Sequence, residues 1–238
     1  IKQGNLVLPD SLEYIDHGVF DQNQCAFKIP LSNKIRYIGA SAFSGASHSF
    51  GYFRLPEFVE FMGGDCFYDY GENIEGEITI PKSITTVPSL AFESMNFANG
   101  TSLTFHDKVL RIESRAFSEN QFNNKIVWPV NLISIGAQAF SSCNFRGGME
   151  NLPDGLSHLG DGAFFDSKNL PENLNLPLHL SKVSGYAFFG TNIRSVNISG
   201  YTETIEGNAF ASCEDLTTVK IGKYVESIGS WAFGGCPA

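Results

Sequence analysis

The sequence is a tandem repeat with a period of about 24 residues, and this period restricts the fold more than any other feature. In each copy an alanine, or in two copies a valine or a cysteine, is followed by phenylalanine, and these phenylalanines are 22 to 25 residues apart. The ten anchoring phenylalanines are Phe20, Phe43, Phe67, Phe92, Phe117, Phe140, Phe164, Phe188, Phe210 and Phe233. Such a chain buries equivalent side chains from every copy, which is typical of a solenoid.

Each copy also carries apolar residues at fixed distances before its phenylalanine. The positions five and eight residues before it are aliphatic or methionine, with Thr202 as the exception. The positions twelve and fourteen before it alternate with polar residues, as Ile78 and Ile80 do ahead of Pro81, which predicts a short strand ended by a turn. Because one strand recurs in the same direction, we expect a mainly β repeat solenoid of about ten coils, with one short parallel strand per coil and no long helix.

The repeat unit resembles a known family. The pattern Ile-Gly-x-x-Ala-Phe-x-x-Cys-x-x-Leu-x-x-Val-x-Ile, clearest between Ile205 and Phe233, resembles the BspA-like class of leucine-rich repeats, although the cysteine is present only at Cys143, Cys213 and Cys236. The resemblance implies a right-handed leucine-rich-repeat arc, a bacterial cell-surface or secreted location, and adhesion to host proteins or other cells. We expect residues 1–238 to form a single leucine-rich-repeat solenoid domain that is a segment of a longer array or precursor.

Charge and hydropathy exclude two classes of partner. The chain has 16 basic and 25 acidic residues, for a net charge of −9, which disfavours nucleic acid. No stretch approaches the roughly 18 apolar residues of a membrane span. The sequence begins at Ile1 without a signal or anchor segment, as a mature form or an excised segment would. We expect a monomer.

The sequence offers no candidate for catalysis, for a metal or for a cofactor. The five histidines occupy unrelated positions of the repeat, and the acidic loop at residues 65–77 lacks the spacing of a calcium loop. A regular solenoid implies no deep cleft, so we expect no enzyme activity. The five cysteines leave at least one thiol without a partner. Cys213 and Cys236 are at equivalent positions of adjacent coils, where a disulfide is within reach, but parallel side chains favour two reduced thiols.

The outward strand face is the candidate binding surface. It is formed by the residues thirteen and fifteen before each phenylalanine, where few large apolar side chains occur. The residues that we predict to bind a ligand are Tyr52, Arg54, Glu77, Thr79, Thr104, Lys125, Asn175, Asn197 and Lys220. Tyr52 and Arg54 are the strongest candidates, expected beside Glu77 and Thr79 of the next coil. The alternative is a strand face that is merely soluble.

Two functions are consistent with these observations. The first is a non-enzymatic, surface-displayed module that binds an extracellular protein or a glycan, with adhesion to host or other cells as its role. The second is a structural scaffold or spacer that projects other domains of a longer chain. Neither end of the sequence carries the polar cap that a free solenoid end requires, as expected for a segment of a longer array.

Overall fold

Ten phenylalanine rings form one continuous stack through the interior of the protein. Neighbouring ring centroids are 5.2 to 5.9 Å apart, and their planes lie within 23° of parallel. The rings from Phe43 to Phe210 are fully buried, whereas Phe20 and Phe233 at the two ends are partly buried. The buried column that the repeat predicts is therefore confirmed.

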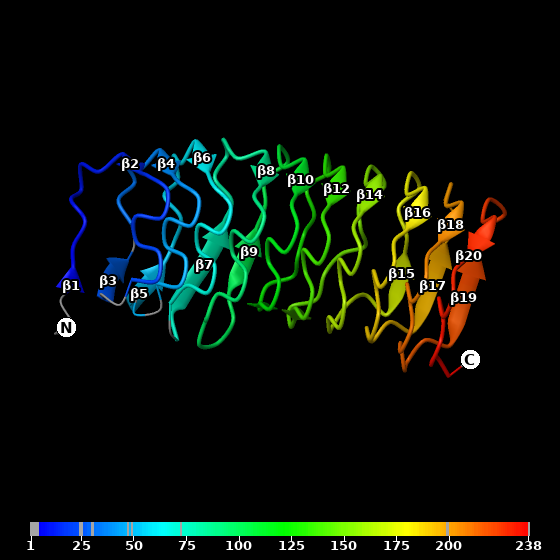
Figure 1. Cartoon of the computed structure of the whole chain (residues 1–238). Coiled ribbons are helices and arrows are strands. Elements are labelled where there is room, and N and C mark those ends of the chain that lie inside the picture. The colour runs from blue at the N-terminus through cyan, green and yellow to red at the C-terminus, as the bar shows by residue number, and fades with distance from the viewer. Residues whose placement is uncertain are drawn as a thin grey trace.

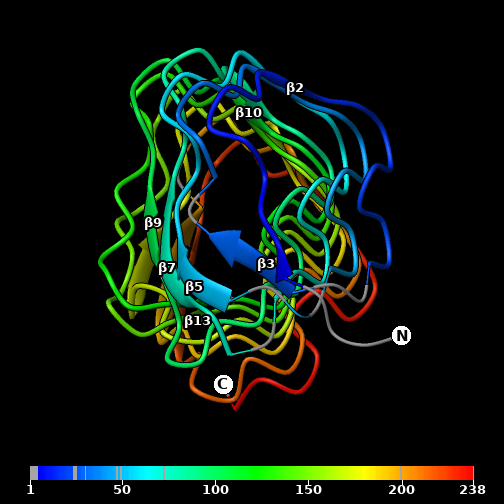
Figure 2. The ribbon, with the colours of Figure 1, turned by 90° about the vertical axis from the view of Figure 1, so that its left-hand side faces the viewer.

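The coils around this column form an elongated solenoid of parallel strands (Figure 1). The computed structural model describes residues 5–23, 26–29, 31–46, 48, 50–71, 73–198 and 200–237. Within those ranges the structure has no helix, and the prediction of a mainly β repeat solenoid of about ten coils is confirmed. Seen from the N-terminal end, the coils superimpose around a common interior that their side chains fill (Figure 2).

The strands predicted from the repeat form the first sheet. Alternation places every second side chain of these strands inward, as Ile78 and Leu103 show. The sheet consists of two separate ladders. Their strands are β1 (Asn5–Leu6), β3 (Ala26–Ile29), β5 (Phe50–Phe53), β7 (Glu75–Thr79) and β9 (Ser102–Thr104), and then β15 (Asn173–Asn175), β17 (Ser195–Ile198) and β19 (Thr218–Ile221).

A second strand in every coil departs from the expected single strand. Each is two residues long and ends at the aliphatic or methionine residue five before the phenylalanine. These strands are β2 (Tyr14–Ile15), β4 (Tyr37–Ile38), β6 (Phe61–Met62), β8 (Thr86–Val87), β10 (Arg111–Ile112), β12 (Ser134–Ile135), β14 (His158–Leu159), β16 (Lys182–Val183), β18 (Thr204–Ile205) and β20 (Ser227–Ile228). Because a strand of two residues shows no alternation, the sequence carries no periodic signal for it.

A third, short ladder lies beside the interruption of the first sheet. It pairs β11 (Gln121–Phe122) with β13 (Asn144–Phe145), and it buries Phe122 and Phe145 against the phenylalanine column. In the same coils the first sheet is reduced to one bridge between Ile126 and Met149. Pairing between the central coils therefore shifts from the first sheet to the segment after the phenylalanine.

The turn around each anchoring phenylalanine is the most regular element. Two residues before it and two residues after it, φ lies between 47° and 77° in all ten coils. This left-handed conformation costs about 1–2 kcal/mol for a residue other than glycine, and Leu90, Tyr186 and Trp231 all adopt it. The amide of each of the first nine phenylalanines donates to the carbonyl of the residue preceding the next phenylalanine, at 2.8 to 3.0 Å. The turn thus holds adjacent coils together at every step.

The second sheet is interrupted twice, between β6 and β8 and between β14 and β16. Elsewhere the residue after each two-residue strand donates its amide to the preceding coil, as Gly63 does to the Ile38 carbonyl at 2.9 Å. Pro88 holds this position after β8 and has no N–H to donate. After β16 the side-chain hydroxyl of Ser184, rather than its backbone amide, donates to the Leu159 carbonyl, at 2.5 Å. At each interruption the residue after the strand therefore differs from the glycine or glutamate that donates its amide in the other coils.

Candidate binding face

The residues predicted to bind a ligand lie on the outward side of the first sheet. Alternation explains this placement, because the side chains between them, such as Ile78 and Val196, point into the core. Tyr52 is half exposed, and Glu77 and Asn197 are partly buried. The remaining six are exposed: Arg54, Thr79, Thr104, Lys125, Asn175 and Lys220.

The neighbours of Tyr52 and Arg54 differ from the expected ones by two residues. Tyr52 pairs with Glu75 rather than with Glu77, and the Arg54 Nε atom lies 3.7 Å from Oε1 of Glu77. The expectation was wrong because β5 and β7 are offset relative to the phenylalanine column. Gly76 permits the offset: its φ is 149°, and a Cβ there would lie 2.2 Å from the Phe53 carbonyl oxygen. A shift of two residues keeps the same side chains outward.

Three of the predicted residues border one hollow. Arg54, Thr79 and Thr104 come from three successive coils and line a cavity of about 290 Å³. Its apolar wall includes Ile80 and Phe105. The cavity approaches the size range of about 300–1,000 Å³ that small-molecule pockets have, which suits one anchoring side chain or one sugar residue.

The C-terminal part of the face is an internal amide ladder. Asn175, Asn197 and Lys220 are in register on β15, β17 and β19, and the Asn197 side-chain amide donates to Oδ1 of Asn175 at 3.1 Å. The Asn151 side chain in turn accepts from the backbone amide of Asn175 at 2.9 Å. These bonds use the Asn197 Nδ2 donor and the Asn175 and Asn151 acceptors, and Asn197 Oδ1 is buried, so this part of the face has fewer groups left for a ligand.

Lys125 is separated from both groups. Its Nζ atom pairs with Oε1 of Glu150 at 3.1 Å, in the coils where the first sheet is interrupted. There the Asn124 side chain replaces a strand: it accepts from the Leu103 amide at 2.9 Å and donates to the Leu103 carbonyl at 2.8 Å. The predicted columns therefore do not form one continuous surface, because a side chain takes over the pairing of β9.

The cysteines in the described part of the chain are free, and Cys25 lies outside it. The thiols of Cys143, Cys213 and Cys236 donate to the carbonyls of Phe117, Phe188 and Phe210 at 3.1 to 3.2 Å. Their shared direction explains why adjacent thiols do not face each other. Burial raises the pKa of Cys143 to about 12, which keeps this thiol protonated and unreactive at neutral pH.

A stack of aromatic rings on the outside of the second sheet, with two exposed rings around a partly buried one, was missed by the sequence reasoning. Tyr14, Tyr37 and Phe61 stack outside β2, β4 and β6, with centroids 4.2 and 4.5 Å apart. All three lie six residues before their phenylalanine. An aromatic residue at that position in three successive copies was the signal that could have found them.

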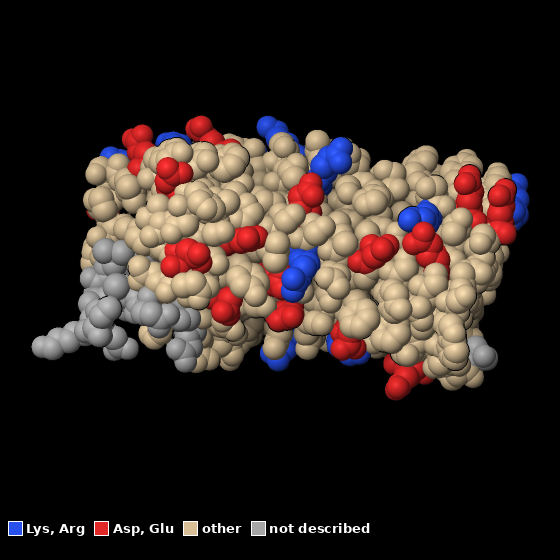
Figure 3. All heavy atoms as spheres, viewed as in Figure 1, with Lys and Arg blue, Asp and Glu red and all other residues tan. Residues whose placement is uncertain are grey.

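No metal or catalytic arrangement is visible in the part of the chain that the structure describes. No three His, Cys, Asp or Glu side chains within it are placed to hold a metal ion. In the same residues there is no helix that could serve as a membrane span. Charged side chains of both signs are scattered over the face shown in Figure 3, between wide uncharged areas.

Comparison with known proteins gives a family and a fold. The family model described as "BspA type Leucine rich repeat region (6 copies)" matches residues 2–122, 50–151, 95–170 and 148–238. No curated protein sequence matches significantly.

Three bacterial crystal structures are similar to the chain. A leucine rich cell surface protein from Faecalibacterium prausnitzii A2-165 is 16% identical, with a TM-score of 0.41 over 91% of this chain and 87% of that one. A leucine-rich repeat protein from Eubacterium ventriosum is 14% identical, with a TM-score of 0.47 over 98% and 83% of the two chains. One from Bacteroides ovatus is 18% identical, with a TM-score of 0.39 over 98% and 85%.

Proposed function

We propose that this chain, which belongs to the BspA-type leucine-rich repeat family, is a non-enzymatic binding module displayed on a bacterial surface. Its partner is an extracellular protein or a glycan, and its role is adhesion to host or other cells. The family supports a surface location. The absence of a metal-binding cluster in the described residues is compatible with a protein that binds without chemistry of its own.

The observation that carries this proposal is the hollow that Arg54 lines, two residues along the chain from Tyr52. Half of the Tyr52 side chain is exposed, and tyrosine and arginine are enriched among the residues that dominate binding energy. The Arg54–Glu77 ion pair joins an exposed arginine to a partly buried glutamate at 3.7 Å, so a partner can exchange it at modest cost. An apolar wall with a charged rim is the arrangement that a buried anchor at an interface requires.

The test begins with a screen of the chain against immobilised extracellular-matrix proteins and a glycan array. For a partner found there, Tyr52→Ala combined with Arg54→Ala should weaken binding at least tenfold, or about 1.4 kcal/mol. The melting temperature should change little, because both side chains are exposed.

The matched control is Lys223→Ala combined with Tyr224→Ala. This pair also places a cation beside an exposed tyrosine ring, at 4.9 Å, but it lies in the last coil and takes no part in the hollow that Arg54 lines. Equal losses in the two double variants would contradict the site. The absence of any partner in the screen would favour the second candidate function, a scaffold or spacer that projects other domains.

A further inference from the structure

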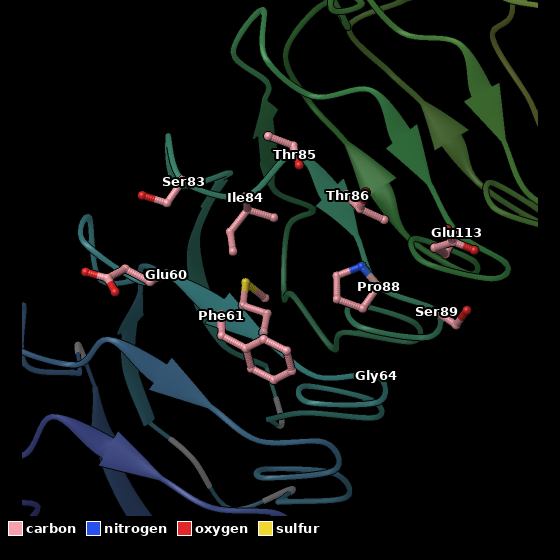
Figure 4. Close-up of a pocket in the computed structure, with 11 residues that line it drawn as sticks. Glu60, Phe61, Gly64, Ser83, Ile84, Thr85, Thr86, Pro88, Ser89 and Glu113 are labelled. Atoms are coloured by element: carbon pink, nitrogen blue, oxygen red, sulfur yellow. The ribbon is translucent and has the colours of Figure 1, made fainter.

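A second hollow lies on the second sheet, away from the face proposed above. It has a volume of about 490 Å³ and opens between β6 and β8, where the sheet is interrupted (Figure 4). Phe61, Met62 and Pro88 contribute apolar surface, and Glu60 and Glu113 stand at its two ends. Its volume falls within the range of about 300–1,000 Å³ of small-molecule sites.

This second hollow between β6 and β8 is called the slot below. The interruption of the sheet leaves backbone groups on both sides of the slot without a partner among the described residues. In the ladder from β8 to β14, the carbonyl of the residue before a strand accepts from the backbone amide of the next coil, as the Thr85 carbonyl does from the Leu110 amide at 2.8 Å. The equivalent carbonyl of Glu60 and that of Met62 receive no such bond, and the amides of Thr85 and Thr86 make none. The slot therefore presents acceptors on one wall and donors on the other.

One wall of the slot is an aromatic face. Phe61 ends the stack of aromatic rings, and Tyr37 covers one of its faces with an interplanar angle of 9°. The next coil places Thr86 at the equivalent position, so no further ring continues the stack and Phe61 stays 45% exposed. The free face of Phe61 therefore borders the hollow (Figure 4).

We propose that this slot binds a neutral pyranose residue of a glycan. The C–H face of the sugar would take the next place in the aromatic stack, against the negative π-face of Phe61. Its hydroxyl groups both donate and accept, so they match the Glu60 and Met62 carbonyls together with the Thr85 and Thr86 amides.

The chemistry of the rim disfavours two other occupants. An aromatic side chain of a peptide would stack on Phe61 but leave these polar groups without hydrogen bonds, at a cost in affinity. A uronic or sialic acid would bring its carboxylate between Glu60 and Glu113, where like charges repel, and the nearby Arg36 guanidinium already pairs with Glu60 at 4.0 Å. This inference goes beyond the proposed function, because the outward face of the first sheet takes no part in it.

The probes are lactose, maltose, cellobiose and N,N′-diacetylchitobiose, with a disaccharide that contains glucuronic acid as the anionic comparison. Binding is measured by saturation-transfer NMR and by titration. We expect at least one neutral disaccharide to bind, and Phe61→Ala to weaken it at least tenfold. The control Tyr224→Ala, which removes another exposed ring, should bind as the wild type does.

A second variant closes the slot instead of removing its aromatic wall. Pro88→Gly restores an amide donor where five other coils have glycine, so β8 can pair with Met62 as Gly63 pairs with Ile38. It should lose disaccharide binding without a lower melting temperature. Unchanged affinity in either variant would overturn the proposal, as would no binding of any neutral disaccharide or stronger binding of an aromatic peptide. The Tyr52 and Arg54 double variant should keep disaccharide binding, which separates this test from that of the outward face.

Discussion

The first coils and the last coils pair their outward strands in different registers. From β1 to β7, the spacing in sequence between paired strand residues is two residues shorter than the spacing between the phenylalanines of the same coils. Tyr52 and its partner Glu75 are 23 residues apart, whereas Phe67 and Phe92 are 25 apart. From β15 to β19 the strands and phenylalanines keep equal spacing.

The phenylalanine stack is nevertheless alike in both regions, with centroids 5.2 to 5.9 Å apart in the first four coils and 5.3 to 5.4 Å apart in the last three. The phenylalanine turn therefore sets the pairing of coils. The outward strand can slide over it in steps of two, because such a step preserves which side chains are buried.

The largest effect should come from removing the element that both regions share. Phe140→Ala or Phe164→Ala, in the centre of the stack, should destabilise the fold by about 3–5 kcal/mol, because a fully buried ring leaves a cavity. Phe233→Ala should cost less, since this ring is only partly buried. Urea unfolding followed by circular dichroism measures the difference. Equal costs at the centre and at the end would contradict the dependence of the cost on burial of the ring.

Glycine substitutions should have different effects on stability in the first coils and in the last coils. Gly76→Ala should destabilise the fold by about 1–3 kcal/mol, because its φ of 149° and its approach to Phe53 leave no room for Cβ. In the C-terminal region, Gly185→Ala should be nearly neutral, since a Cβ there would lie 3.4 Å from its nearest neighbour, the Gly207 carbonyl oxygen. Thermal unfolding of both variants provides the comparison. A neutral Gly76→Ala would mean that the offset of β7 does not depend on this glycine.

The smallest effect concerns pH. Glu93 follows its anchoring phenylalanine and is buried, whereas Ala211 holds the equivalent position in the C-terminal region. Burial raises the pKa of Glu93 above 4.5, against the opposing effect of the Arg115 guanidinium. The folded state then holds this proton more tightly than the unfolded state, so stability falls as pH rises from about 4.5 through the raised pKa.

Glu93→Gln should remove this part of the pH dependence and retain a hydrogen-bonding group beside Arg115. Melting temperatures of the wild type and the variant, measured between pH 4 and pH 8, test the expectation. Parallel curves for the two proteins would contradict it.

The sequence predicted the elements whose signal repeats in every copy. The phenylalanine column and the strand with Ile78 and Ile80 both follow from the period. The second strand did not, because only Ile15 of Tyr14–Ile15 is buried and two residues show no period. The offset of the first sheet is confined to the first coils, where the strand partners are two residues fewer apart than the phenylalanines, and averaging over copies hides such a feature.

For the candidate site, sequence reasoning placed Tyr52 and Arg54 on the surface but did not predict the hollow that Arg54 lines. The hollow depends on how three coils align: Thr79 and Thr104 keep the register of the repeat, but β5 is offset from β7, and the repeat does not predict that offset. Pro88 was a readable signal: five copies have glycine at its position, and a proline there cannot donate to the preceding coil. Departures from the repeat, rather than its consensus, marked the second hollow.

The interruptions of the second sheet also have a mechanical consequence. Hydrogen bonds between coils run along the length of the solenoid, so they bear a tensile load applied to its ends. The second sheet is continuous only within blocks of three, four and three coils. At the two block boundaries the load passes through the phenylalanine turn and the strand or side-chain contacts that remain. We expect a stretched chain to yield first at these boundaries and to extend in discrete steps.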